Sequence, residues 1–117
     1  MKITTTDNKG IHLECSDGKV FSIQFGAGNY CDNYDNDMIE QFEKKPNTSS
    51  ENAEVAVWQK DGEWETFKHF PGDGDHEEGH SDVVGHKTIR EILETVLKHE
   101  QGLHTLWASQ NVAIWKR

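Results

Sequence analysis

Two short segments of alternating apolar and polar residues, joined by an Asp-Gly pair, constrain the fold more than any other feature of the chain. The segments are residues 11–15 and 20–25, and Asp17-Gly18 lies between them. Alternation with a period of two is typical of a strand with one buried face, and Asp-Gly is strongly favoured in tight hairpin turns. The sequence therefore predicts an antiparallel hairpin. Its inward-facing side chains are Ile11, Leu13, Cys15, Phe21, Ile23 and Phe25.

The same pattern recurs in the middle of the chain. Residues 53–58 alternate, Asp61-Gly62 supplies a turn, and Trp64 and Phe67 fall in the segment that follows. We therefore expect a second hairpin, with Trp64 and Phe67 on its return strand.

Both ends of the chain also predict strands. Lys2–Thr6 is rich in β-branched residues, and Asn111–Lys116 places Val112 and Ile114 on one face. β-branched side chains fit a pleated, half-buried surface, so we expect a short strand at the N-terminus and a closing strand at the C-terminus.

The clearest helix signal runs from Thr88 to Glu100. Thr88 and Glu91 match a capping box, and Gly102 suits the position just after a helix. Apolar residues at helical spacing predict that one face packs on the sheet. These residues are Ile89, Ile92, Leu93, Val96 and Leu97.

A shorter helix is expected after the first hairpin. Asn36 or Asp37 can cap it, and Met38, Ile39 and Phe42 would form its buried side. Lys44-Lys45-Pro46 would end it, because proline cannot continue a helix.

These elements predict an α+β fold: a twisted antiparallel sheet of about five to six strands, with one main C-terminal helix packed on one face. The 117 residues suit a single domain spanning 1–117. Residues 46–52 and 71–82 are polar and carry no periodicity, so we expect two mobile loops there.

The charge of the chain limits its partners. The net charge of −9 repels phosphate, so binding of duplex nucleic acid or of an anionic membrane is disfavoured. The same charge suits docking on a basic protein surface, and Asp32, Asp35 and Asp37 are the candidate partner-binding residues. Plain solubility is the other interpretation of the charge.

The remaining composition points to the cytoplasm. The N-terminus has no apolar leader, and no run approaches the roughly 20 apolar residues of a membrane span. The two cysteines, Cys15 and Cys31, are then expected to stay reduced. Cys15 falls on the inward strand face, which predicts an inert thiol.

A glycine-rich loop follows the first hairpin and is the candidate ligand-binding site. Gly26 and Gly28 allow close approach of the backbone to a partner, Asn29 adds an amide, and Tyr30 adds a stacking face. Exposed N–H groups there could bind an anion, and Trp58 is a further candidate. A structural loop with Tyr30 packed inward is the alternative.

Residues 76–80 match the His-Glu-x-x-His pattern of zinc hydrolases. That pattern requires a helix, whereas Pro71, Gly72, Gly74 and Gly79 disfavour one here. We therefore expect no cofactor and no catalytic residue. A metal held by a loop remains an alternative, with ligands drawn from His76, His80 and His86, and so does a small zinc-dependent hydrolase.

Three blocks of the sequence resemble a pattern in small phage-encoded accessory proteins of the counter-defence type. They are residues 21–33, which read Phe-Ser-Ile-Gln-Phe-Gly-Ala-Gly-Asn-Tyr-Cys-Asp-Asn, residues 53–58 and residues 82–85. The resemblance implies a non-enzymatic binding protein in the cytoplasm of the host cell. Such a protein would block a host defence protein or sequester a small nucleotide ligand. An acidic immunity-type protein that neutralises a basic toxin is an alternative, and a homo-oligomer remains open.

Overall fold

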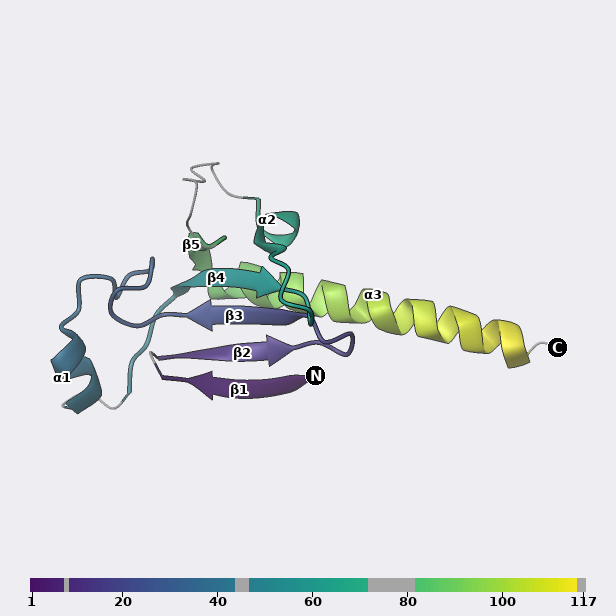
Figure 1. The fold of residues 1–117 in the computed structure, drawn as a ribbon, viewed down its shortest axis with the longest axis horizontal. Coiled ribbons are helices and arrows are strands. Elements are labelled where there is room, and N and C mark those ends of the chain that lie inside the picture. The colour runs from purple at the N-terminus through teal and green to yellow at the C-terminus, as the bar shows by residue number, and fades with distance from the viewer. Residues whose placement is uncertain (8, 44–46, 72–81, 116–117) are drawn as a thin grey trace.

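The structure is a computed structural model that describes residues 1–7, 9–43, 47–71 and 82–115, with the backbone alone for 42–43 and 105–115. Five antiparallel strands form one sheet in the order β1-β2-β3-β4-β5 (Figure 1). The strands are β1 Lys2–Thr6, β2 Gly10–Glu14, β3 Val20–Gln24, β4 Asn52–Trp58 and β5 Val84–Thr88. The helices are α1 Met38–Glu43, α2 Thr66–His69 and α3 Ile89–Trp115. The predicted α+β fold is confirmed.

The first hairpin forms as its sequence predicts. Ile11 pairs with Ile23 across β2 and β3, and Leu13 pairs with Phe21. The turn closes with a hydrogen bond from the Cys15 N–H to the Lys19 carbonyl, 2.8 Å long. Gly18 adopts a φ of +87°, a conformation that other residues rarely accept. The Asp-Gly turn therefore fixes the register between β2 and β3.

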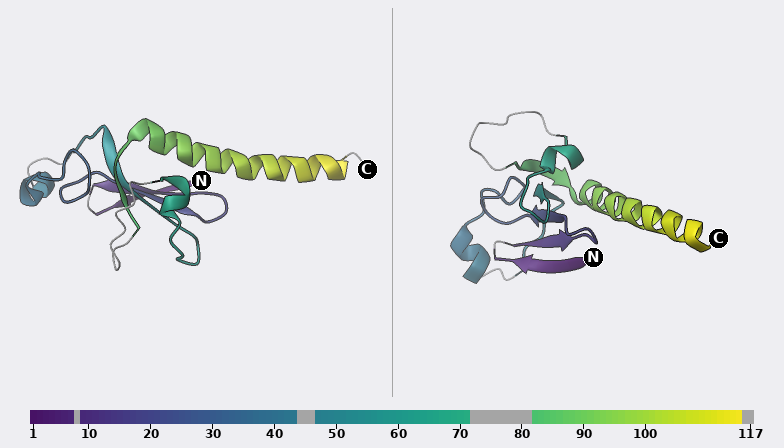
Figure 2. Two further views of the ribbon diagram at one scale, coloured as in Figure 1. Left: turned by 90° about the horizontal axis from the view of Figure 1, so that it is seen from above. Right: turned by 45° about the vertical axis from the view of Figure 1, so that its right-hand side comes forward.

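The core lies between the sheet and α3, which runs along one face and projects well beyond it (Figures 1 and 2). Phe21, Val55 and Val57 from the strands and Ile92 and Val96 from the helix are all buried. Burying one such side chain contributes about 1.5–3 kcal/mol. The N-terminal half of α3 therefore holds the fold together.

The C-terminal half of the chain differs from the prediction in two ways. Residues 111–115 continue α3 instead of forming a closing strand, and Gly102 lies inside the helix instead of ending it. A glycine within a helix costs only about 1 kcal/mol, and no proline follows to stop it. The fifth strand is β5, which directly precedes α3 and pairs with β4.

The second hairpin is also shorter than predicted. Within the predicted return strand, Trp64 pairs with β4 through an isolated bridge to Trp58, whereas Phe67 lies in α2. The buried Thr66 hydroxyl lies 2.8 Å from the Val57 nitrogen and donates to the Asp82 carbonyl at 2.7 Å. The Val57 N–H therefore bonds to a side chain of α2 instead of to the backbone of a return strand.

The predicted apolar stripe of α3 is buried only in part, and the described members of the α1 stripe are exposed. Met38 and Ile39 of α1 are exposed, so the predicted burial of this pair is wrong, and the Phe42 side chain lies outside the described atoms. Leu93 and Leu97 of α3 are also exposed. They lie about 100° further around the helix than the buried Ile92 and Val96, beyond the strip that meets the sheet. Among the described residues, no helix has the length and apolar character needed to cross a membrane.

Candidate binding surface at residues 26–40

The predicted glycine-rich loop is part of the segment that connects β3 to α1, and this segment has no regular secondary structure. Its backbone N–H groups are satisfied within the protein. Gly26 donates to Asn29 Oδ1, Ala27 to Gln41 Oε1, and Gly28 to the Tyr34 carbonyl, at 2.8–3.0 Å. The Asn29 and Cys31 N–H groups donate to carbonyls within the loop. The Asn29 side chain therefore shapes the loop, and an anion would have to displace existing bonds to bind the backbone.

Two strands hold this loop in place. The Tyr30 N–H donates to Glu54 Oε2 on β4 at 2.9 Å, and the Tyr30 carbonyl accepts from the His86 N–H on β5 at 2.9 Å. The Asp32 N–H donates to the Asn52 side chain, also at 2.9 Å. These bonds fix the Tyr30 backbone against β4 and β5.

Aromatic and aliphatic side chains are exposed on this fixed loop and on α1. The rings of Tyr30 and Tyr34 stack at 5.5 Å and only 4° from parallel, and the two residues are 51% and 48% exposed. Met38 and Ile39 are exposed at the start of α1. The Tyr30 ring does not pack inward, in contrast to the alternative of a structural loop with Tyr30 buried, and both tyrosine rings are accessible at the surface.

Carboxylates accompany these rings. Residues 26–43 include five acidic residues and no basic residue: Asp32, Asp35, Asp37, Glu40 and Glu43. The first four are exposed. Asp37 also caps α1 through a 2.9 Å hydrogen bond from the Glu40 N–H, as its sequence position predicts. Among the described residues, no hydrogen bond or ion pair engages Asp35, so its charge is available to a partner.

A polar hollow of about 230 Å³ adjoins this surface. It lies between α1 and residues 47–49, and its lining includes Asn33, Asp37 and Gln41. Asn33 donates to the Phe25 and Ser49 carbonyls at 2.8 and 3.0 Å, which ties the loop to residues 47–49. The hollow extends the acidic surface with amide groups.

The structure brings most of the predicted site residues together, with Trp58 as an exception. Trp58 pairs with Val20 at the end of the β3–β4 ladder farthest from Gly26. Its ring packs edge-on against the rings of His12 and Trp64, with 5.1 and 5.4 Å between the ring centroids. Trp58 therefore shares no site with the glycine-rich loop.

The predicted metal ligands fall in different places. His76 and His80 lie outside the described residues, while His86 lies exposed on β5 with a φ of 54°. In the part of the chain that the structure describes, no three His, Cys, Asp or Glu side chains are arranged to hold a metal ion.

Cys15 and Cys31 are both buried, and neither forms a disulfide bond. Burial, together with the nearby Glu100 and Asp17 carboxylates, raises the pKa of Cys15 to about 11. Burial also raises the pKa of Cys31. A thiol with a raised pKa is a poor nucleophile, so the structure favours the inert role predicted for Cys15.

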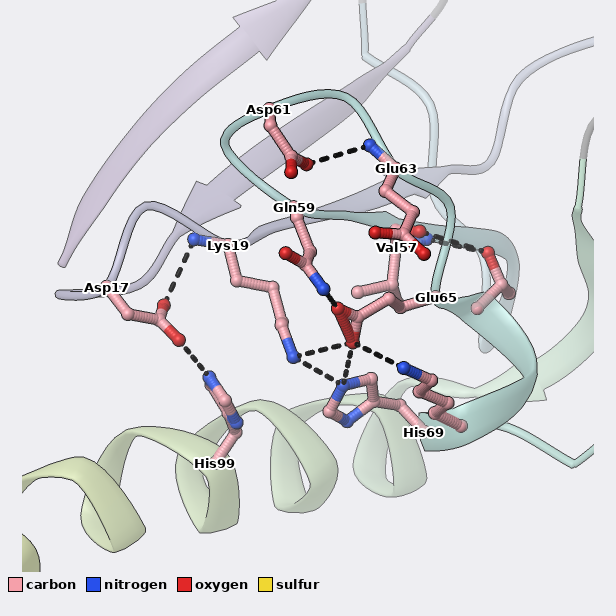
Figure 3. A network of polar contacts seen from close by, with 11 residues as sticks. Asp17, Lys19, Val57, Gln59, Asp61, Glu63, Glu65, His69 and His99 are labelled. Carbon is pink, nitrogen blue, oxygen red and sulfur yellow. Dashed lines mark hydrogen bonds and ion pairs between the residues drawn. The ribbon is translucent and has the colours of Figure 1, made fainter.

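A second polar cluster was not predicted from the sequence. Asp17, Lys19, Glu65, His69 and His99 converge between the β2–β3 turn, α2 and α3 (Figure 3). We call these five residues the Glu65 cluster. The residues joined by its bonds lie 46, 50 and 82 positions apart, so no local motif reveals them.

Comparison of the chain with protein-family models, with curated proteins and with solved structures finds no match.

Proposed function

We propose that this chain is a non-enzymatic phage-type binding protein that counters host defence by docking on a basic surface of a defence protein. The docking surface consists of Tyr30, Tyr34, Met38 and Ile39 with the carboxylates around them. The observation that carries the proposal is the exposed, stacked Tyr30–Tyr34 pair within a stretch that has no basic residue.

The composition of this surface matches that of a protein interface. Tyrosine and methionine are enriched in interface cores, and a few aromatic residues usually provide most of the binding energy. Exposed carboxylates steer a basic partner into contact and disfavour acidic competitors. A net charge of −9 strengthens that steering at low ionic strength.

The same geometry favours docking over the capture of a small nucleotide. A phosphate needs free N–H groups or cations, whereas the N–H groups of Gly26, Ala27 and Gly28 already have partners. Trp58, the other candidate for stacking on a base, lies at the far end of the ladder. The resemblance to counter-defence proteins agrees with either mode, and the hydrogen bonds within the loop are the reason that we propose docking.

A plating experiment tests the proposal. Bacterial strains that each carry one nucleic-acid-targeting defence system would express the wild-type chain or a Tyr34→Ala, Asp35→Lys double variant. Both side chains are exposed, and the Tyr34 ring stacks on the exposed ring of Tyr30, so the substitutions leave the core untouched. Loss of an aromatic anchor costs about 2 kcal/mol or more, roughly 30-fold in affinity. We expect the wild-type chain to restore phage plating in at least one strain and the variant to lose this effect.

The matched control is Glu94→Lys, which reverses a charge on an exposed residue of α3. It should protect the phage as well as the wild-type chain does. Protection that survives in the double variant, or no protection by the folded wild-type chain in any strain, would contradict the proposal. Rescue of cells from a basic toxin instead would support the immunity-type alternative.

A further inference from the structure

The Glu65 cluster is built around one buried carboxylate. Lys19 Nζ lies 3.0 Å from Glu65 Oε2, and Lys68 Nζ lies 3.8 Å from the same oxygen. Gln59 donates to the other oxygen of Glu65. The Lys19 ammonium also lies 3.0 Å from His69 Nε2, so one cation joins the β2–β3 turn to both ends of α2 (Figure 3).

The contact between Lys19 and His69 fixes the charge of the imidazole. An ammonium group has only protons to donate, so Nε2 of His69 must be the ring nitrogen that accepts. His69 is therefore neutral in this arrangement and carries its proton on Nδ1. A hydrogen bond of this kind ends when Nε2 itself takes up a proton.

The surroundings of His69 leave little room for a second positive charge. Lys19 faces it from the β2–β3 turn, Lys68 is its neighbour on α2, and His99 on α3 lies 5.4 Å away between ring centroids. The opposing charges are Glu65, whose Oε2 is 4.0 Å from Nε2, and Asp17, which is bound by His99 at 3.0 Å. Each carboxylate already has a closer partner.

Burial of the ring lowers the pKa of His69 from its ordinary 6.5, and the Lys19 and His99 charges lower it further, against the opposing pull of Glu65 and Asp17. The ring also packs against Phe21, with 5.3 Å between centroids. A group whose pKa is lower in the folded state takes up its proton more readily when unfolded. The stability that neutral His69 contributes is therefore present above pH 6.5 and is lost as the pH falls below that value.

We propose that neutral His69 holds α2 against the β2–β3 turn and α3, and that protonation of His69 in acid releases α2. The Lys19–His69 contact changes sign on protonation. An attractive hydrogen bond becomes a repulsion between two cations 3.0 Å apart. Thr66 anchors the start of α2 independently of pH through its hydroxyl, so release begins at the His69 end.

The first test uses the wild-type protein. Nitrogen and proton NMR of the imidazole groups should show His69 as the neutral Nδ1–H tautomer at pH 7.5, with a titration midpoint below 6.5. Hydrogen exchange of the α2 amides, corrected for the intrinsic effect of pH, should show at least tenfold lower protection at pH 5.5 than at pH 7.5.

The second test uses His69→Gln, whose amide oxygen can still accept from Lys19 but cannot be charged. Protection of α2 should then differ less than twofold between the two pH values. His104→Gln is the control, because His104 is exposed and lies outside the cluster, and it should retain the wild-type response. A His69 midpoint at or above 6.5, or α2 protection that is unchanged at pH 5.5 in the wild-type protein, would overturn the proposal even if His69→Gln fails to fold.

Discussion

At the scale of single residues, the position of Tyr30 depends on a glycine of the neighbouring strand. A Cβ atom on Gly85 would lie 2.5 Å from the Tyr30 Cβ and 3.1 Å from the Tyr30 carbonyl oxygen. Because side chains and backbone cannot approach so closely, β5 and the loop fit together only when residue 85 is glycine.

Substitution of Gly85 by alanine tests this fit. We expect Gly85→Ala to lower the free energy of unfolding by about 1–3 kcal/mol, as overpacking does, and to shift the NMR signals of residues 26–34. Gly102→Ala is the matched control, since no atom lies within 4 Å of a Cβ there, and it should stabilise α3 by about 1 kcal/mol. Equal effects of the two substitutions would show that β5 does not position Tyr30.

The sequence indicated the loop residues as candidates for binding, but it did not indicate the Glu65 cluster. The difference lies in how far apart the residues of each group are along the chain. Asp32, Asp35 and Tyr30 share one short segment, so a local pattern shows them together. Lys19 and His69 come into contact only in the folded protein, where the bond between Thr66 and Val57 places α2 beside the β2–β3 turn. Those long-range contacts leave no periodic signal.

At the scale of the elements, α3 begins where its cap predicts. Thr88 Oγ1 accepts a hydrogen bond from the Glu91 N–H at 3.2 Å. The predicted end of the helix was wrong for two reasons. Gly102 is a residue that often follows a helix, and Val112 and Ile114 suit a strand as well as a helix. The strand β5 was missed because its sequence, VGHKT, has no clear alternation.

Removal of this cap should weaken the helix measurably. We expect Thr88→Ala to lower the free energy of unfolding by about 1 kcal/mol, since one N–H group of the first turn loses its partner. Urea unfolding followed by circular dichroism gives the value, and Thr88→Ser should restore most of it. An unchanged midpoint in Thr88→Ala would mean that packing of Ile92 and Val96 alone sets where the helix starts.

At the scale of the whole molecule, α3 is joined to the sheet by a carboxylate as well as by its core. Glu100 accepts from the Ser16 hydroxyl and from the Ser16 N–H, the latter at 3.0 Å. These two hydrogen bonds lower the pKa of Glu100 below its ordinary 4.5. The ionised form is therefore favoured by folding.

Acid should weaken this connection. A carboxyl group whose pKa is lower in the folded protein contributes stability that is present above pH 4.5 and is lost as the pH falls through the folded value. We expect Glu100→Gln to be less stable than the wild-type chain at pH 7 and to lose less stability between pH 5 and pH 3. Urea midpoints measured across this range decide it, with Glu94→Gln as the exposed control; parallel curves for all three proteins would contradict the prediction.

The fold class could be predicted because binary patterning and turn residues act over short distances, and the hairpin around Gly18 shows this most clearly. The arrangement of the sheet could not be predicted in full, since the alternation in residues 53–58 does not show which later segment pairs with β4.

The dense hydrogen bonding of residues 26–33 also bears on thermodynamics. Contacts to Gln41, Asn52, Glu54 and His86 hold the loop in one shape before any partner arrives. A partner that binds Tyr30 and Tyr34 would therefore restrict few additional backbone torsion angles of the loop. The conformational entropy lost on association would be small. A free peptide of the same sequence would have to lose that entropy on binding, so it should be a much weaker competitor than the intact chain.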